Sequence, residues 1–343
     1  MELNERTKAI LSAIINSHIA TAEPVGSRTV TKRYNLGISP ATVRNIMSDL
    51  EDMGFLAQPH TSAGRVPTDK AYRFYIDMLL EVQTLPKQQE EIIMNYPLPR
   101  EDFNHLMQET TRLLSGISHY AGVVTAPKPA ETIYRHIEFI RLTGKRALGV
   151  FVSNSGLVHN RIITLEEDLT QKELEGVSNF LNREMTGKTL REIRGKVFSM
   201  MEADRNKYTN LLMKLMKSWE DVASSGPENN EAQLFVGGLS EMFNIPEMGI
   251  NRMKDLFLAF EEKHRLLRLL DLAMEAEGVQ VFIGSENPFF DMQGVSLVVA
   301  NYRGEGNVVG SLGVIGPSRM AYNMVIPLVD CTAKVLGRLI SDR

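Results

Sequence analysis

Residues 24–67 read PVGSRTVTKRYNLGISPATVRNIMSDLEDMGFLAQPHTSAGRVP, and this stretch decides the fold of the first part of the chain. Ser39 stands at an N-cap position, Pro40 follows at the first helical position, and Gly54 provides a C-terminal stop. We therefore expect a helix over residues 39–53. The apolar residues that recur every three or four positions along it, and so predict one buried face, are Val43, Ile46, Met47 and Leu50.

The opposite face of this helix carries small and hydrogen-bonding side chains. An arginine can donate to two acceptors of guanine, and an asparagine pairs with adenine in the same bidentate way. An ordinary surface helix would present the same residue types, so this face alone leaves both interpretations open. The residues on it are Ala41, Arg44, Asn45 and Ser48, with Thr42 at its flank.

The segments on either side favour DNA binding. A short helix that we expect Ser27 to cap comes before the turn, and its hydroxyl and cationic side chains suit phosphate contacts. A strand at residues 55–58 and a tip at residues 60–65, with Gly64 as its turn glycine, predict a wing after it. A hairpin of this composition is often only a solvated turn, but the order of elements is that of a winged helix-turn-helix.

Arg65 is placed to enter a minor groove, where a narrow A-tract concentrates negative potential. From Arg28 to Arg73 the chain has seven Lys or Arg against four acidic residues, so shape supports DNA binding more than charge does. The residues that we expect to contact DNA are Ser27, Arg28, Thr29, Lys32, Ala41, Thr42, Arg44, Asn45, Ser48, Ser62 and Arg65.

Most of the chain is not a nucleic-acid surface, because the whole sequence of 343 residues carries a formal net charge of −4. Contact with DNA is therefore expected in one module only. At about 100 to 200 residues per domain, this length predicts two or three domains. Cys331 is the only cysteine, which excludes an intramolecular disulfide and a cysteine-rich zinc site. The chain begins without the features of a signal peptide and contains no long apolar run. We therefore expect a cytoplasmic protein that does not enter a membrane.

Beyond the wing the pattern predicts an α+β multidomain protein. We assign residues 1–83 to the winged helix-turn-helix domain and residues 84–100, which contain three prolines, to a linker. Short β-rich runs at 120–125, 136–142, 146–153 and 158–164 resemble an antiparallel meander, and those at 279–284, 295–302 and 307–317 continue it before a closing helix at 321–341. These runs predict one α+β domain, formed by residues 101–188 and 278–343. The helix-rich residues 189–277 then form an insertion, which is small enough to gain stability by pairing with a second copy.

Several separated motifs resemble the bacterial heat-inducible repressor family HrcA, in the same order along essentially the whole chain. The resemblance implies a homodimer that binds an inverted-repeat operator, CIRCE, and represses chaperone operons. It also implies a GAF-like α+β domain, a dimerisation insertion and assistance by the chaperonin GroEL. The motifs are PVGSRT (24–29), SPATVRNIMSDLEDMGF (39–55), HTSAGRVP (60–67), YRFY (72–75), SLVVANYR (296–303) and GVIGPSRMAY (313–322).

Two alternatives remain beside this interpretation. In the first, the GAF-like domain is a pocket for a small molecule and the protein is a ligand-sensing regulator. In the second, an enzyme carries a DNA-binding head, but the motifs oppose it. TGKT at residues 186–189 has Asn182 where a phosphate loop needs glycine, and GSLGVIG at 310–316 lacks the dinucleotide-binding spacing. We therefore expect no catalytic activity, no cofactor and no metal.

Overall fold

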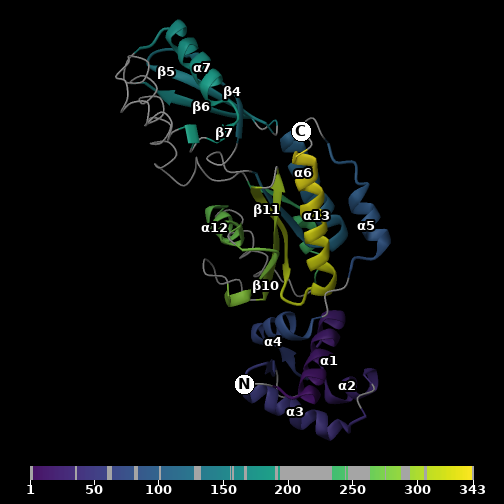
Figure 1. The fold of residues 1–343 in the computed structure, drawn as a ribbon. Coiled ribbons are helices and arrows are strands. Elements are labelled where there is room, and N and C mark those ends of the chain that lie inside the picture. The colour runs from purple at the N-terminus through teal and green to yellow at the C-terminus, as the bar shows by residue number, and fades with distance from the viewer. Residues whose placement is uncertain are drawn as a thin grey trace.

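Figure 1 shows an elongated molecule in three parts, with the winged-helix domain at one end, a central sheet between helices, and a smaller sheet at the other end. The computed structural model describes residues 3–34, 37–59, 64–80, 84–99, 102–126, 133–154, 156, 158–165, 168–189, 192–193, 234–243, 245, 263–274, 276–286, 294–304 and 307–341. Every structural statement below refers to these residues. Among them, no helix combines the length and the apolar character that a membrane span requires.

The N-terminal part is a winged helix-turn-helix, as the sequence predicts. Its three helices pack around a core in which Ile10, Val30 and Val43 are fully buried. The helix after the wing continues as one π-helical turn, η1. The elements are α1 (Glu5–Thr21), α2 (Ser27–Arg33), α3 (Pro40–Asp52), β1 (Leu56–Ala57), β2 (Val66–Pro67), α4 (Asp69–Phe74) and η1 (Tyr75–Leu79).

The central part is an antiparallel sheet in the order β8-β3-β11-β10-β9, with helices on both faces. Helices α6 and α13 cover one face, where Val298, Tyr302 and Leu312 are buried. Helices α10 and α12 cover the other face, over Val123 and Leu297. The bounds are α6 (Phe103–Ser118), β3 (Ala121–Thr125), β8 (Leu234–Gly237), α10 (Leu239–Met242), α12 (Lys263–Met274), β9 (Val279–Ile283), η3 (Gly284–Glu286), β10 (Val295–Gly304), β11 (Asn307–Pro317) and α13 (Tyr322–Ser341).

The third part is a separate sheet in the order β6-β5-β4-β7, with helix α7 on one face. Helix α7 begins with a capping box, in which Thr170 and Glu173 satisfy each other's backbone donors. We call this part the outer module. Its elements are β4 (Ile133–Arg141), β5 (Arg146–Ser153), β6 (Val158–Thr164), α7 (Gln171–Met185) and β7 (Lys188–Thr189).

The strands that the sequence assigns to one α+β domain therefore lie in two separate sheets. The meander of residues 133–164 pairs within the outer module, whereas β3 pairs with β8 and β11. Elements β8, α10 and α12, which fall inside the predicted insertion of residues 189–277, pack in the central layers instead. Alternation and turn residues predict that these strands form a meander. They do not indicate which sheet the meander joins, because hairpin strands pair with their neighbours in sequence. Residues 194–233, which include most of the predicted helical stretch, lie outside the described residues.

The predicted linker of residues 84–100 also carries structure. Its helix α5 (Lys87–Met94) packs against α13, and Ile93 is fully buried there. Leu85 and Leu98, on either side of the helix, belong to the same apolar cluster. This segment is therefore part of the central layers, because its apolar residues are covered, although its prolines indicated a boundary.

Candidate nucleic-acid interface

Helix α3 forms as its caps predict. The Thr42 N–H donates to the Ser39 side chain at 3.1 Å, and Pro40 follows the cap at the start of the helix. Gly54 ends the helix with φ +75°, a conformation that residues with a Cβ rarely adopt. Val43, Met47 and Leu50 are buried on the inner face. The sequence thus determines both the length of this helix and the side that it turns outward.

The outward face of α3 is open. Ala41, Arg44, Asn45 and Ser48 are exposed, as the helical period predicts. The Arg44 and Asn45 side chains make no hydrogen bond or ion pair with any described residue, so their side-chain donors are available to an external acceptor. The helix lies at the far end of the molecule from the outer module (Figure 1). The fifth predicted residue, Thr42, is half-buried and its hydroxyl lies 3.0 Å from that of Ser39, so it supports the cap.

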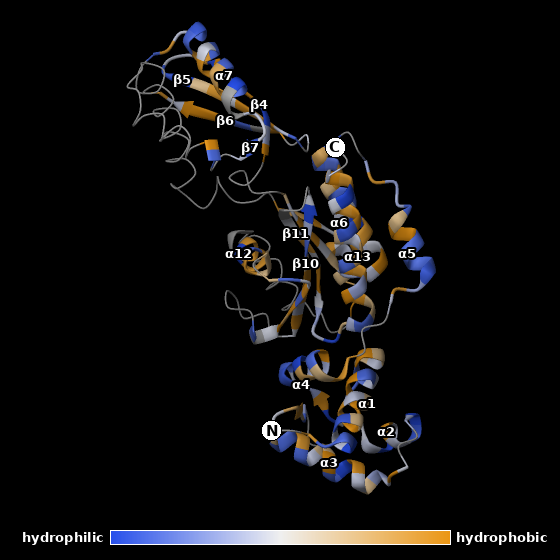
Figure 2. Cartoon of the chain, in the orientation of Figure 1, coloured by the Kyte–Doolittle hydropathy of each residue, from blue (hydrophilic) through white to orange (hydrophobic). Residues whose placement is uncertain are grey.

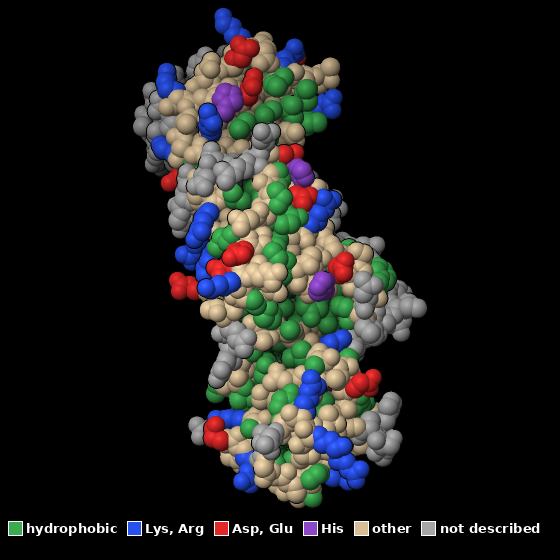
Figure 3. Space-filling model, turned by 90° about the vertical axis from the view of Figure 1, so that its right-hand side faces the viewer, with side chains coloured by type: hydrophobic (Ala, Val, Ile, Leu, Met, Phe, Trp, Pro, Cys, Tyr) green, Lys and Arg blue, Asp and Glu red, His purple; other side chains and the backbone are tan. Residues whose placement is uncertain are grey.

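Charge divides α3 into two halves. Arg44 lies in the first half, whereas the exposed acids Asp49 and Asp52 lie in the last turns. Carboxylates would be repelled by DNA phosphates, and recognition helices commonly contact bases through their N-terminal residues. The charges therefore indicate that the N-terminal half of α3 is the part suited to enter a groove. Figure 3 shows several Lys and Arg side chains on the winged-helix domain at the bottom of the view.

Helix α2 presents Arg28, Thr29 and Lys32 to solvent. The predicted N-cap is wrong by one residue. Gly26 occupies the cap position, without a side-chain hydrogen bond, and Ser27 is the first helical residue. Gly26 acts as the N-cap through its backbone, because its carbonyl accepts hydrogen bonds from the N–H groups of Thr29 and Val30. Ser27 is half-buried, so it is a less open candidate for a phosphate contact than its neighbours.

The base of the wing is fastened to the loop before α2. Val25 and Arg65 exchange two backbone hydrogen bonds, of 2.8 and 2.9 Å. A Cβ on Gly64 would lie 2.5 Å from the backbone of Val25, so this position needs glycine because two chains approach closely. The sequence predicted that a turn requires this glycine. The structure shows instead that the close approach of Val25 requires it. The wing tip, residues 60–63 with the predicted contact Ser62, lies outside the described residues.

Arg65 has a partner that the sequence did not indicate. Its Nε donates to Glu51 Oε2 at 2.7 Å, and the two side chains are 22% and 30% exposed. Glu51 stands near the end of α3, so this ion pair connects the wing to the recognition helix. The Arg65 side chain is therefore directed toward the protein, and a contact with a minor groove would compete with Glu51.

Among the described residues, no group of three or more His, Cys, Asp or Glu side chains is arranged to hold a metal ion. The exposed polar groups of α2 and α3 suit hydrogen bonding to a nucleic acid.

Comparison with known families decides the assignment. Residues 2–80 match the family described as "Winged helix-turn-helix transcription repressor, HrcA DNA-binding", and residues 104–326 match "HrcA protein C terminal domain". The chain belongs to the HrcA family. The N-terminal match covers all the described elements of the winged-helix domain, so the open face of α3 belongs to a DNA-binding domain.

Relatives support the HrcA assignment over the whole chain. The heat-inducible transcription repressor HrcA of Geobacter sulfurreducens is 46% identical, and the alignment covers 99% of this chain and 98% of the relative. The repressor of the same name from Nitrosomonas europaea is 42% identical, with 99% and 100% covered. The chain is therefore a member of a family of heat-inducible transcription repressors with a winged-helix DNA-binding domain.

A solved structure shares the fold. It is described as the crystal structure of a hypothetical protein at 2.2 Å resolution, and it is similar to this HrcA-family chain with a TM-score of 0.66. The two sequences are 22% identical, and the match covers 99% of each chain. The fold thus recurs in a sequence of low identity.

Proposed function

We propose that this HrcA-family chain represses chaperone operons by binding the inverted-repeat operator CIRCE as a homodimer. The observation that carries the proposal is the open polar face of α3, where Arg44 and Asn45 have no partner among the described residues. In this proposal Arg44, Asn45 and Ser48 read base edges, with Ala41 allowing a close approach. Arg28, Thr29 and Lys32 on α2 contact phosphates and set the register.

A duplex that carries the CIRCE repeat tests operator recognition. The protein should bind it at least about a thousandfold more tightly than a scrambled duplex at the same salt concentration, as specific regulators do. Equal affinities for the two duplexes would reject the proposed operator. Salt must be matched because phosphate contacts alone change affinity strongly with ionic strength.

The homodimer is proposed to form through the outer module. On the face of its sheet that α7 does not cover, Ile140, Val158 and Ile162 are 39%, 55% and 54% exposed. Ile140 and Ile162 flank Leu148 in one row across the sheet. Figure 2 shows hydrophobic residues along β6. Contiguous exposed apolar surface of this kind is typical of an interface, and a second copy of the chain would cover the same residues on both partners.

Light scattering tests the dimer. An Ile162→Asp variant should lower the mass from that of two chains to that of one, because a carboxylate would be buried in the apolar interface. Asn179→Asp, on an exposed position of α7, introduces the same single negative charge elsewhere in the module and should leave the dimer intact. A dimer that persists in Ile162→Asp would exclude this sheet face and leave the predicted insertion, residues 189–277, as the candidate. Deletion of residues 194–233 then tests the insertion while keeping β8, α10 and α12.

Chaperonin control is the remaining part of the proposal, and the family resemblance supports it. If GroEL assists folding of the repressor, GroEL occupied by unfolded protein leaves fewer competent dimers and releases the operators. Adding GroEL with ATP to freshly diluted repressor should raise the fraction that binds CIRCE, and an excess of unfolded competitor should cancel the gain. A bound fraction that ignores GroEL would reject this control.

A ligand-sensing regulator is the second candidate function. A cavity of about 460 Å³ lies between β10 and the end of α13, and Arg303, Lys334 and Arg338 line it. The buried faces of the central sheet, in contrast, are filled by side chains such as Tyr302. Asp330 also lines the cavity and pairs with Lys334, so Arg303 and Arg338 supply its excess positive charge. Inorganic phosphate and citrate are probes for that charge. Operator affinity that changes with either of them would favour the sensor, and the repressor proposal predicts no change at constant ionic strength.

A further inference from the structure

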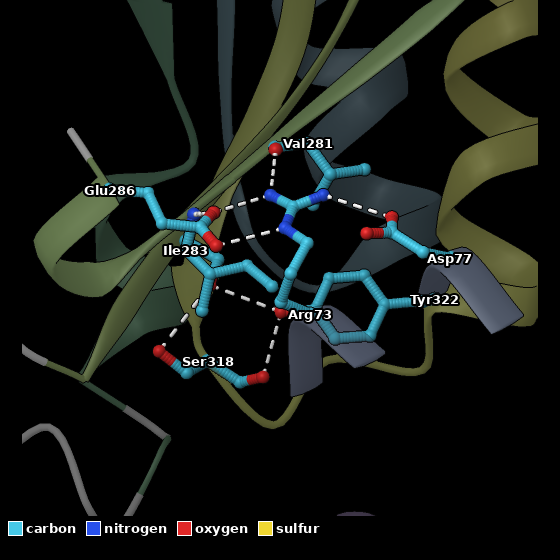
Figure 4. Close-up of polar contacts among 8 residues, drawn as sticks. Arg73, Asp77, Val281, Ile283, Glu286, Ser318 and Tyr322 are labelled. Carbon is cyan, nitrogen blue, oxygen red and sulfur yellow. Dashed lines mark hydrogen bonds and ion pairs between the residues drawn. The ribbon is translucent and has the colours of Figure 1, made fainter. Parts of the chain in front are cut away.

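The winged-helix domain is joined to the central sheet by more than the chain itself. Helix α4 packs against β9 at the end of the sheet. Arg73 of α4 lies at the centre of this junction and points toward β9 and η3 (Figure 4). We call the contacts of Arg73 with Val281 and Glu286 the Arg73 fork.

All three guanidinium nitrogens of Arg73 have partners. Nε donates to Glu286 Oε1 at 2.9 Å, and Nη2 donates to Glu286 Oε2 and to the Val281 carbonyl, the latter at 2.5 Å. Nη1 donates to Asp77 Oδ1 at 3.3 Å. Arginine alone presents such a planar set of donors, so lysine cannot reproduce the fork.

Glu286 is itself held by its own turn. Its Oε2 accepts the backbone N–H of Ile283 at 3.1 Å, so the carboxylate is oriented before Arg73 meets it. The side chains of Arg73 and Glu286 are 31% and 34% exposed. A bidentate pair that is partly shielded from water and held on both sides restricts rotation more than an exposed ion pair does.

Buried contacts surround the fork. The rings of Tyr72 and Tyr322 lie 6.3 Å apart, and both residues are almost fully buried. Tyr72 also shares a hydrogen bond with His18 of α1 at 2.7 Å. Arg319, in the turn before α13, donates to the Ile19 carbonyl at 3.0 Å. The junction is therefore a packed interface that fixes two helices of the winged-helix domain against the central domain.

The DNA-reading face lies away from this junction. Figure 1 places α3 on the far side of the winged-helix domain from the central sheet, and Arg44 and Asn45 are exposed there. The junction therefore does not block DNA, and its effect is on the direction in which α3 faces. In a dimer that direction sets the separation and angle of the two recognition helices, which must match half-sites about one helical turn apart or a multiple of it.

We propose that Arg73 and Glu286 are positioning residues that hold the two recognition helices in register for an inverted repeat. The inference rests on the proposed homodimeric function. It assigns operator binding a requirement outside the DNA-contacting surface. With the fork broken, each head still reads its own half-site, but the second half-site is engaged at a lower effective concentration.

The test compares two duplexes, one with the whole inverted repeat and one with a single half-site. Arg73→Lys keeps the charge but loses the fork, and Glu286→Gln keeps the size but loses the charge. Each variant should bind the repeat about tenfold more weakly, because part of the avidity is lost, and bind the half-site as the wild type does. Arg112→Lys is the matched control, since Arg112 pairs with Glu109 within the single helix α6.

A double variant, a mass measurement and a wild-type comparison complete the test. The double variant should be no weaker than either single variant, since the two residues act on the same contact. Mass by light scattering should remain dimeric. Equal losses on both duplexes, or no loss on the repeat, would overturn the inference. A wild-type protein that binds repeat and half-site equally would instead overturn the proposed operator function, so the two failures are distinguishable.

Discussion

The open face of α3 and the junction around α4 lie at the same small domain, but their arginines differ in how many hydrogen-bond partners the protein gives them. The guanidinium of Arg44 makes no hydrogen bond or ion pair within the described part of the chain, whereas every guanidinium nitrogen of Arg73 has a partner. Donors left without a protein acceptor are available to a ligand, and donors that are saturated hold the protein's own parts together. The comparison therefore separates the residues that we propose to contact DNA from those that we propose to orient the domain.

Arg44→Ala is expected to have the largest effect on the α3 side of this comparison. Loss of a bidentate base contact should weaken operator binding by about 1 to 3 kcal/mol while leaving binding to random DNA nearly unchanged. Titrations on the two duplexes at one salt concentration measure both quantities. Arg112→Ala, on α6 of the central domain, is the control and should change neither. Equal losses on both duplexes would assign Arg44 to the phosphate contacts.

Cap removal compares the two helices directly. Ser39→Ala removes the N-cap of α3 and should lower the free energy of unfolding by about 1 kcal/mol. Thr68→Ala removes the N-cap of α4, and the Thr68 hydroxyl also donates to the Gly54 carbonyl at 2.8 Å. The Thr68 variant should therefore lose more stability in urea titrations. If Ser39→Ala lost more, the junction helix would not be the more firmly held of the two.

Lys32→Ala tests the phosphate surface beside the recognition helix. The variant should weaken binding to operator and random DNA by a similar factor and reduce the slope of log affinity against log salt by about one. Affinities at four or more salt concentrations give the slope. A loss confined to the operator would show that α2 also reads sequence.

Arg65 is intermediate between the two regions, because it lies at the wing but is paired with Glu51. Arg65→Ala should weaken binding by only a few-fold, without a change in base preference, since partly exposed ion pairs contribute about 1 kcal/mol or less. Glu51→Gln breaks the same pair but keeps the arginine. If both variants behave alike, Arg65 positions the wing. A loss in Arg65→Ala alone would support the predicted contact with the minor groove.

Local signals made the winged-helix domain predictable. Caps at Ser39 and Gly54 and the period of Val43, Met47 and Leu50 determine α3 within a few turns of chain, and the same signals identify its exposed face. The β-rich runs at 279–284, 295–302 and 307–317 likewise locate β9, β10 and β11, although β10 is covered on both faces and shows no alternation of buried and exposed residues. Local signals placed these elements, although they misplaced the N-cap of α2 by one residue, at Ser27 instead of Gly26.

Contacts between distant residues were not predictable. Arg73 and Glu286 are 213 positions apart, and nothing in either segment indicates the other. The close approach of Gly64 to Val25 also needs the folded wing, because a glycine in a loop signals a turn equally well. Strand β3 pairs with β8 and β11, and the strands of the outer module form a sheet of their own. Alternation of apolar residues does not indicate which strands pair across such distances in the sequence.

A footprint of the purified protein on its own genomic DNA tests the central claim most directly. The account predicts protection of two inverted half-sites on one face of the duplex, loss of that protection in Arg44→Ala, and a higher occupied fraction when GroEL is present. Protection of a single half-site, or of no discrete segment at all, would contradict the proposal that this chain reads an inverted repeat through α3.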